Sequence, residues 1–237
     1  MPREPAGDAW SDLRPATAGR RVRRTARSAS TSTSTSGPGP GPGSRIGVLG
    51  GTFDPVHIGH LVVAQEARFA LALDRVLLVV ANDPWQKSGD RPVTPAGDRL
   101  AVVEAAVAGV PGIQASRIEI DRGGPSYTVE TLHEIAAAEP GAALFLVVGA
   151  DVVPTLPSWH RAADLPSLAT LVVARRAGMP RVPDPGGWSA VHLPVPRLDV
   201  SSSGLRARLA AGAPVDFLVP AAAIRCIAAR GLYAGPR

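Results

Sequence analysis

Short apolar runs alternate with longer amphipathic stretches from Arg45 onward, and this alternation predicts strands and helices in turn. The apolar runs of strand length are 46–49, 75–80, 113–120, 143–148, 168–174 and 190–195. Apolar residues recur at helical spacing over 58–73, 95–108 and 126–138, and two further helices are expected near the C-terminus. Apolar strands that alternate with helices are typical of a parallel sheet covered on both faces. The pattern therefore predicts a single α/β domain built on a doubly wound parallel sheet.

The first 44 residues differ from the rest in composition. They hold seven arginines against three acidic residues, then a Ser/Thr alternation over 28–36 and a Gly/Pro run over 37–43. Such a stretch cannot bury enough apolar surface to offset the entropy lost on ordering. We therefore predict a disordered basic extension over 1–44 and a folded domain over 45–237. An organelle transit peptide and an extended start-site assignment both remain open for the extension.

The net charge of +5 arises mostly in this extension, because residues 45–237 carry eighteen cationic against seventeen acidic side chains. The high pI is therefore no evidence of a basic face for nucleic acid on the folded part, and we expect no specific nucleic-acid partner. No run reaches the roughly 18 apolar residues of a membrane span, and no secretory signal core follows the first charges. We expect a cytoplasmic protein without a membrane partner. Cys226 is the only cysteine, which excludes a disulfide framework and a cysteine-based metal site.

Residues 50–60 read GGTFDPVHIGH and connect the first predicted strand to the first predicted helix. Glycines let a backbone turn sharply and approach a ligand closely, and a helix N-terminus stabilises an anion through its amides and its dipole. His57 and His60 are three residues apart at this helix start, so both could contact one polyphosphate. Imidazoles offer donors there and exchange a proton near neutral pH. The segment predicts a phosphate-binding loop.

Other polar groups follow the remaining predicted strands. They are Asn82 to Lys87, Gly149 to Asp151, Arg175 with Arg176, and Ser201 to Ser203. Ligands of open α/β sheets bind beyond the carboxyl ends of the strands, so these groups are expected in one site. Lys87 is the only lysine in the chain, which has 24 arginines. This favours the interpretation that the position requires a compact point charge, although the lysine could also have been kept by chance. The serines could equally form an ordinary helix cap.

Two motifs together resemble the nucleotidyltransferase superfamily that carries an H-x-G-H motif. The first is the strand, the Gly-Gly-Thr-Phe-Asp-Pro loop and His57-Ile58-Gly59-His60. The second, residues 200–206, reads VSSSGLR and is similar to the I-S-S-T-x-x-R motif of several branches. The resemblance implies a Rossmann-like fold in which the loop holds a nucleoside triphosphate. It also implies that the serine hydroxyls and Arg206 hold the β- and γ-phosphates from the side opposite the histidines.

The middle of the chain resembles the bacterial nicotinate-nucleotide adenylyltransferases. The similarity runs from Arg45 to Tyr233 and includes GPSYTVETL at 124–132, GAD at 149–151, Ser158-Trp159, VDFLVP at 215–220 and RGLY at 230–233. It implies that the backbone around Tyr127 and Thr128 receives the nicotinate carboxylate and that Trp159 stacks on the pyridine ring. Taken alone, both aromatic residues could instead be packed core residues. His133, His160 and His192 belong to no motif.

The chain departs from the commoner family pattern at the end of the second strand. Pro84-Trp85-Gln86-Lys87 stands where many members have Pro-Pro-His-Lys, and Ala81-Asn82-Asp83 lacks the usual Pro and Gly. A third histidine contact is therefore missing, although Lys87 is in place.

The resemblance implies transfer of the adenylyl group of ATP to nicotinate mononucleotide, giving deamido-NAD and pyrophosphate. The implied catalytic residues are His57, His60, Lys87 and Arg206; the implied ATP contacts add Gly50, Gly51, Thr52, Phe53, Gly149, Asp151, Ser201, Ser202 and Ser203; and the implied nicotinate mononucleotide contacts are Lys87, Tyr127, Thr128, Trp159 and Arg175. Mg²⁺ would bind through the ATP phosphates, without a protein metal site. Two alternatives stay open, another H-x-G-H transferase such as a phosphopantetheine adenylyltransferase and a non-catalytic nucleotide sensor. The sequence also leaves open whether the chain forms a homo-oligomer.

Overall fold

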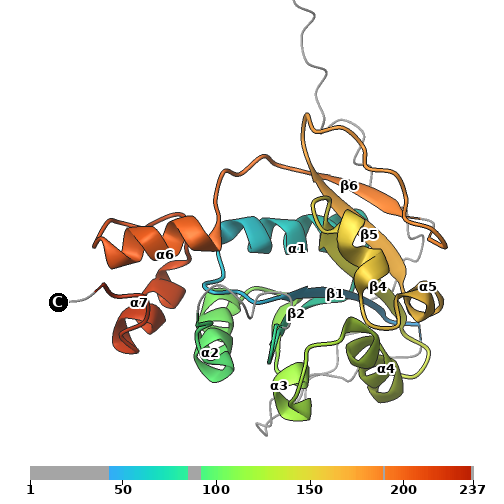
Figure 1. Cartoon of the computed structure of the whole chain (residues 1–237), viewed down its shortest axis with the longest axis horizontal. Helices are drawn as coiled ribbons and strands as arrows, with labels where there is room; N and C mark the ends of the chain where they lie inside the picture. Colours follow the sequence, from blue (N-terminus) through green and yellow to red (C-terminus); the bar gives the residue numbers. More distant parts are fainter. Residues whose placement is uncertain (1–42, 85–91, 189, 236–237) are drawn as a thin grey trace, which may run out of the picture.

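A six-stranded parallel sheet forms the centre of the molecule (Figure 1). The computed structural model describes residues 43–84, 92–188 and 190–235. The strands are β1 (Arg45–Gly51), β2 (Arg75–Val80), β3 (Ile113–Ser116), β4 (Ala143–Gly149), β5 (Thr170–Arg176) and β6 (Val191–Val195). Each neighbouring pair is parallel, in the order β3-β2-β1-β4-β5-β6. The predicted α/β class with a doubly wound, Rossmann-like sheet is confirmed.

The order of the strands reverses at β1. The chain moves outward from β1 through β2 to β3, then returns to the other side of β1 with β4 and continues outward to β6. In open parallel sheets, such a reversal leaves a crevice beyond the carboxyl ends of the two central strands, where ligands bind. The carboxyl ends of β1 and β4 are therefore where the site is expected.

Helices cover both faces of the sheet. They are α1 (Ile58–Ala70), α2 (Ala96–Val107), α3 (Ile118–Arg122), α4 (Thr128–Ala138), α5 (Leu165–Leu168), α6 (Ser202–Ala210) and α7 (Ala221–Ala229), with short 3₁₀ helices at Val153–Ser158 and Ala162–Asp164. Figure 1 shows α1 on one face and α4 on the other.

The core follows the two-residue period of the strands. Val76, Leu78 and Val80 of β2 pack in the cluster that contains residues of α1 and α2, whereas Val79 packs in the cluster that contains residues of α4. Side chains of a strand alternate between its two faces, so each apolar strand contributes to both layers.

Two of the predicted strands include residues that are helical in the structure. The run 113–120 ends as a strand at Ser116 and turns into α3, where Arg117, the residue before the helix, forms an ion pair with Asp121. Gly123, with φ +71°, ends this helix. The run 168–174 begins as a strand only at Thr170, because the residues before it close α5. Short apolar runs do not distinguish a strand from one turn of helix.

The predicted disordered extension lies outside the described residues except for its last two, and Lys87 also lies outside them. Among the residues that the structure describes, no helix is long and apolar enough to cross a membrane.

Candidate active site

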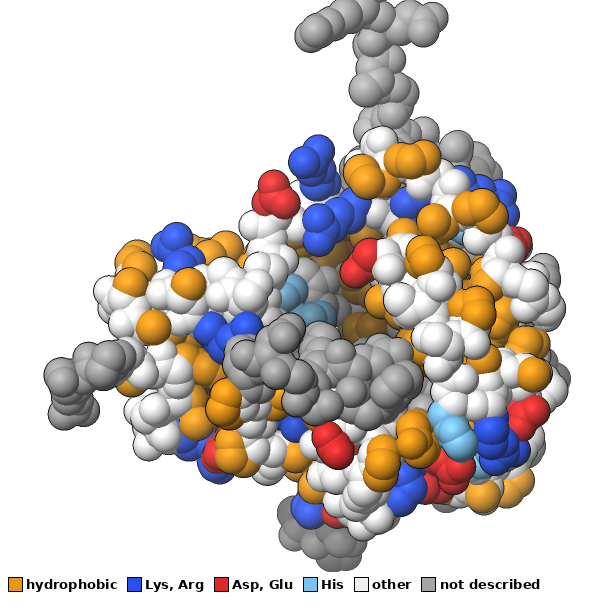
Figure 2. Space-filling model, viewed as in Figure 1, with side chains coloured by type: hydrophobic (Ala, Val, Ile, Leu, Met, Phe, Trp, Pro, Cys, Tyr) orange, Lys and Arg blue, Asp and Glu red, His pale blue; other side chains and the backbone are white. Residues whose placement is uncertain are grey.

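A cleft of about 1350 Å³ opens at the carboxyl ends of β1, β4 and β5. Figure 2 shows a hollow in the middle of one face of the molecule, with histidine atoms at its bottom. The predicted site residues that line the cleft are Gly50, Gly51, Thr52, Phe53, His57, His60, Tyr127, Thr128, Gly149, Asp151, Trp159, Ser201, Ser202, Ser203 and Arg206. The structure thus brings together the predicted residues of four separate segments of the chain.

Two glycines and one phenylalanine with a left-handed backbone conformation shape the loop between β1 and α1. Phe53 has φ +48°, a conformation that side-chain-bearing residues rarely adopt. A Cβ on Gly51 would lie 2.9 Å from the Phe53 ring, and a Cβ on Gly59 would lie 3.0 Å from two atoms of the His57 ring. Non-bonded carbon atoms prefer separations of about 3.5–4.0 Å. The two glycines therefore allow the rings of Phe53 and His57 to lie directly against the backbone.

The two motif histidines stack on one another at the start of α1. Their ring centroids lie 3.8 Å apart, with an angle of 27° between the ring planes. The backbone N–H of His57 donates to Nδ1 of His60 at 3.2 Å. Because Nδ1 of His60 accepts this bond, the proton of the neutral ring resides on Nε2, where it is a donor. The rings of Phe53 and His60 are nearly perpendicular, with centroids 5.0 Å apart and 83° between the planes, and this contact further fixes the orientation of His60.

His57 is neutral at pH 7 because of its surroundings. It is 7% exposed, and burial, with a smaller contribution from the positive charge of Arg176, lowers its pKa to about 4. Its Nδ1 is buried without a hydrogen-bond partner in the described part of the chain. A buried polar atom that lacks a partner costs free energy, and a polar ligand in the cleft could relieve that cost.

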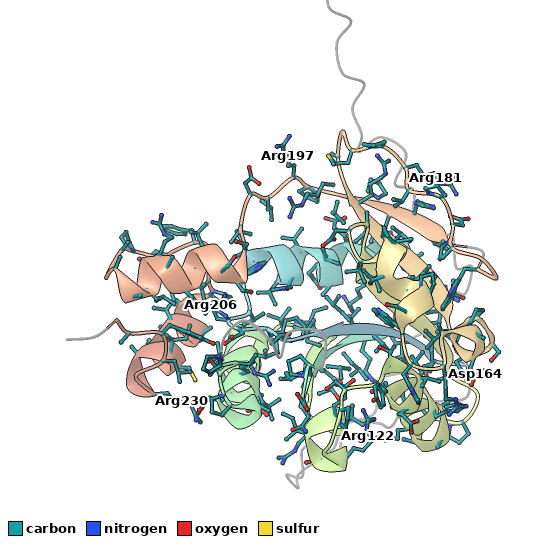
Figure 3. The ribbon with its side chains drawn as sticks, in the orientation of Figure 1. Arg122, Asp164, Arg181, Arg197, Arg206 and Arg230 are labelled. Atoms are coloured by element: carbon teal, nitrogen blue, oxygen red, sulfur yellow. The ribbon has the colours of Figure 1, made fainter. Side chains whose placement is uncertain are left out.

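The serine and arginine motif at 200–206 is hydrogen-bonded to the loop that contains the histidine motif. Ser201 caps α6 by accepting from the N–H of Gly204 at 3.2 Å. Ser202 Oγ donates to the carbonyl of Pro55 at 2.9 Å, and Nη1 of Arg206 donates to the carbonyl of Asp54 at 2.6 Å. Figure 3 shows Arg206 projecting from α6. The N-termini of α1 and α6 therefore border the same cleft, and each can direct backbone amides at an anion.

Two further contacts to the loop come from residues that sequence reasoning missed. The hydroxyl of Tyr233 donates to Oδ1 of Asp54 at 2.8 Å, and Nη1 of Arg99 donates to the carbonyl of Thr52 at 2.8 Å. Asp54 is 2% exposed and Arg99 is 1% exposed. The sequence did contain a signal for Arg99, because it shares a helical face with apolar residues three, four and seven positions later. A charge in an apolar stripe indicates a buried partner.

The opposite wall of the cleft is aromatic and adjoins the N-terminus of α4. The Tyr127 ring stacks on His160 with centroids 4.2 Å apart and 23° between the planes. Trp159 is half-buried beside them. Nε1 of Trp159 and Oγ of Ser126 are buried and, within the described residues, have no hydrogen-bond partner. His160, which belongs to no motif in the sequence, is exposed and lines the cleft beside Tyr127.

The ends of β4 and β5 complete the cleft. A Cβ on Gly149 would lie 2.4 Å from Oδ1 of Asp151, so this glycine leaves room for the carboxylate. Arg175 is not among the lining residues and donates from Nη1 to the carbonyl of Met179, whereas its neighbour Arg176 lines the cleft. Strand residues alternate between the two faces, which explains why only one of two adjacent arginines reaches the cleft.

The fold and the cleft define a nucleotidyltransferase, and residues 48–208 match the cytidylyltransferase-like family model. Over 192 residues the chain is 44% identical to a probable nicotinate-nucleotide adenylyltransferase of Corynebacterium kroppenstedtii, covering 80% of this chain and 90% of the relative. It is 43% identical to one from Saccharopolyspora erythraea, covering 81% and 90%. The chain therefore belongs to the nicotinate-nucleotide adenylyltransferase family.

Solved structures share the fold. The nicotinic acid mononucleotide adenylyltransferase of Plasmodium falciparum, complexed with NaAD, superimposes with a TM-score of 0.63 at 17% identity, covering 80% of this chain and 97% of that one. A putative nicotinate-nucleotide adenylyltransferase of Vibrio parahaemolyticus has a TM-score of 0.59 at 19% identity, covering 80% and 95%. The predicted family and enzyme class are confirmed, and the roles of individual residues stay predictions.

Proposed function

We propose that this chain transfers the adenylyl group of ATP to nicotinate mononucleotide, giving deamido-NAD and pyrophosphate. The observation that carries the proposal is the pair of stacked imidazoles at the N-terminus of α1, joined through the loop to the start of α6. Two helix N-termini, two imidazoles and an arginine suit a triphosphate, because all of them offer donors to anionic oxygens.

The reaction needs no general base. The second pKa of a phosphate monoester is about 6, so the attacking phosphate oxygen of the acceptor is already anionic at pH 7. This oxygen forms a bond to the α-phosphorus of ATP, and the bond from that phosphorus to the bridging oxygen of the β-phosphate breaks. Pyrophosphate leaves with the bonding electron pair. Catalysis then consists of positioning and of stabilising charge in the transition state.

We assign a role to each residue according to the side of the cleft on which its side chain lies. His57 and His60 stabilise the charge that develops on the α-phosphate, and the hydrogen bond from the backbone N–H of His57 to Nδ1 of His60 fixes the orientation of the His60 ring. Ser202 and Arg206 hold the departing pyrophosphate. Lys87 belongs to the same proposed set, although it lies outside the described residues.

The acceptor is proposed to bind at the aromatic wall. Trp159 offers a face for a pyridine ring, and the amides at the start of α4, around Tyr127 and Thr128, suit a carboxylate. Asp151 is assigned to the nucleotide sugar or base. Arg175 remains assigned to nicotinate mononucleotide, which would require it to leave its bond to Met179.

The proposal includes Mg²⁺ bound through the ATP oxygens, where it would neutralise part of the triphosphate charge. A cytoplasmic location belongs to the same proposal.

Pyrophosphate release tests the proposal, with nicotinate mononucleotide, nicotinamide mononucleotide and phosphopantetheine as parallel acceptors. We expect fastest release with nicotinate mononucleotide. His60→Ala should lower turnover by roughly 10² or more with an unchanged melting temperature, because it removes a donor to developing charge. His133→Ala, on the exposed face of α4, is the matched control and should keep normal turnover. Release with phosphopantetheine alone would identify the other transferase, and no release with any acceptor would identify a nucleotide sensor.

A further inference from the structure

Arg99 is a buried arginine that joins three segments of the chain. Its side chain is 1% exposed and lies in α2. Nη1 donates to the carbonyl of Thr52 at 2.8 Å, Nη2 to the carbonyl of Asn82 at 3.2 Å, and Nε to the carbonyl of Thr94 at 2.6 Å. These carbonyls belong to the loop at 50–60 that is predicted to bind phosphate (the phosphate loop), to the residues that follow β2 and to the segment before α2. One guanidinium therefore holds three backbone segments at fixed separations.

Burying this charge is costly unless its donors are all used. Burial lowers the pKa of Arg99, and the negative charges of Asp54 and Glu119 oppose that effect. The guanidinium fork suits the task because its donors have fixed directions, which a lysine lacks. An apolar residue would fill the same position in the stripe of α2 without the electrostatic cost. Packing alone therefore does not explain why an arginine stands at this buried position.

The end of β2 carries the connection onward to the acceptor side of the cleft. Nδ2 of Asn82 donates to the carbonyl of Gly124 at 2.9 Å, and the N–H of Ser126 donates to the carbonyl of Asp83 at 3.0 Å. Residues 124–126 lead directly into Tyr127 and the N-terminus of α4. A continuous series of hydrogen bonds therefore runs from Thr52 through Arg99 and Asn82 to Gly124.

We propose that Arg99 is a positioning residue that couples the phosphate loop, through Asn82, to the turn at 124–127 that leads into α4 on the acceptor side of the cleft. Through this coupling, each substrate strengthens the binding of the other. The inference rests on the proposed function, since it needs the donor at one end of the series and the acceptor at the other. A ligand that orders one loop also orders the second, and the second substrate then loses less conformational entropy on binding. Such coupling is reciprocal and typically amounts to about 5- to 150-fold.

Calorimetry measures the coupling directly. The probe is an ATP analogue with a methylene bridge between the α- and β-phosphates, which binds without turnover. Its dissociation constant is determined with and without saturating nicotinate mononucleotide. We expect a ratio of about 10 for the wild type, and about 1 to 2 for Arg99→Met and for Asn82→Ala. Combining the two substitutions should lower the ratio no further, because both interrupt the same series.

The control is Arg230→Met, which removes the surface ion pair to Asp98 on the same helix (Figure 3). This variant should keep the wild-type ratio. Melting curves report whether Arg99→Met folds; if it does not, Asn82→Ala decides, because Asn82 is only half-buried. A wild-type ratio near 1, or an unchanged ratio in Asn82→Ala, overturns the inference. Failure of the wild type to bind nicotinate mononucleotide or to release pyrophosphate with it instead overturns the proposed function.

Discussion

Replacing Gly59 by alanine tests whether the position of the His57 ring governs activity. Gly59 is the second residue of α1, and an added Cβ would meet Cε1 and Nδ1 of His57 at 3.0 Å and Cγ1 of Val200 at 3.2 Å. Carbon atoms prefer about 3.5–4.0 Å, so the His57 ring must move by about a few tenths of an ångström. Because the His57 ring stacks on His60 with centroids 3.8 Å apart, a shift of the His57 ring changes the geometry of the histidine pair.

The expected loss is one of activity rather than of stability. A misplacement of about 1 Å can cost roughly 10² in rate, so a shift of a few tenths of an ångström should lower kcat several-fold, by about tenfold at most. Alanine also favours a helix over glycine by up to about 1 kcal/mol, which offsets part of the steric cost to folding. The melting temperature should therefore change little while turnover falls.

Gly97→Ala provides the matched control. Gly97 is the second residue of α2, and a Cβ there would meet nothing within 4 Å. The same substitution at the same helical position should leave kcat unchanged. Pyrophosphate release and thermal unfolding are measured on both variants and the wild type. Normal turnover in Gly59→Ala would refute the positional role of His57, and equal losses of activity and of melting temperature would assign the effect to folding.

Three further predictions concern binding, stability and pH. Trp159→Ala should raise the KM for nicotinate mononucleotide about tenfold, as lost stacking of about 1.4 kcal/mol implies, with the KM for ATP little changed; equal increases in steady-state assays would make Trp159 structural. Tyr233→Phe should lower the free energy of unfolding in urea by about 1–3 kcal/mol, because buried Asp54 loses a donor, and a change below about 0.5 kcal/mol would contradict this. Folding stability should fall by at most about 3 kcal/mol as the pH drops from 6.5 to 4, since the unfolded state then binds more protons at His57 than the folded state does. His57→Gln should lack that part of the loss, and identical pH curves would show that His57 does not contribute to it.

Much of the fold and most of the cleft could be predicted because local patterns carry them. Apolar strands alternating with helices indicate a parallel sheet, and a parallel sheet places residues that follow different strands at one edge. Gly50, Gly149 and Ser201 come from distant segments and line one cleft for that reason. The sequence could not tell which of Arg175 and Arg176 faces the cleft, since that depends on which face of β5 each side chain occupies.

The remaining features depend on contacts between distant residues. Arg99 and Tyr233 bond to the phosphate loop from α2 and from the C-terminal region, and no local pattern names their partners. The stacking of His160 on Tyr127 likewise joins two segments without a common motif. A polar residue at a position predicted to be buried indicates that it has a hydrogen-bond partner, but only the folded structure shows which residue that partner is.

The bonds to Asp54 have a consequence for folding. Arg206 and Tyr233 lie 152 and 179 residues after it in the chain. Contacts of such high contact order are costly in loop-closure entropy, so they form after much of the chain has assembled. The phosphate loop therefore acquires its final shape late, although it belongs to the first strand and helix. Because the unfolded chain lacks this loop, ATP binds only the finished form and draws the equilibrium toward it. On the proposed function, a higher concentration of ATP thus raises both the rate of the reaction and the stability of the folded chain.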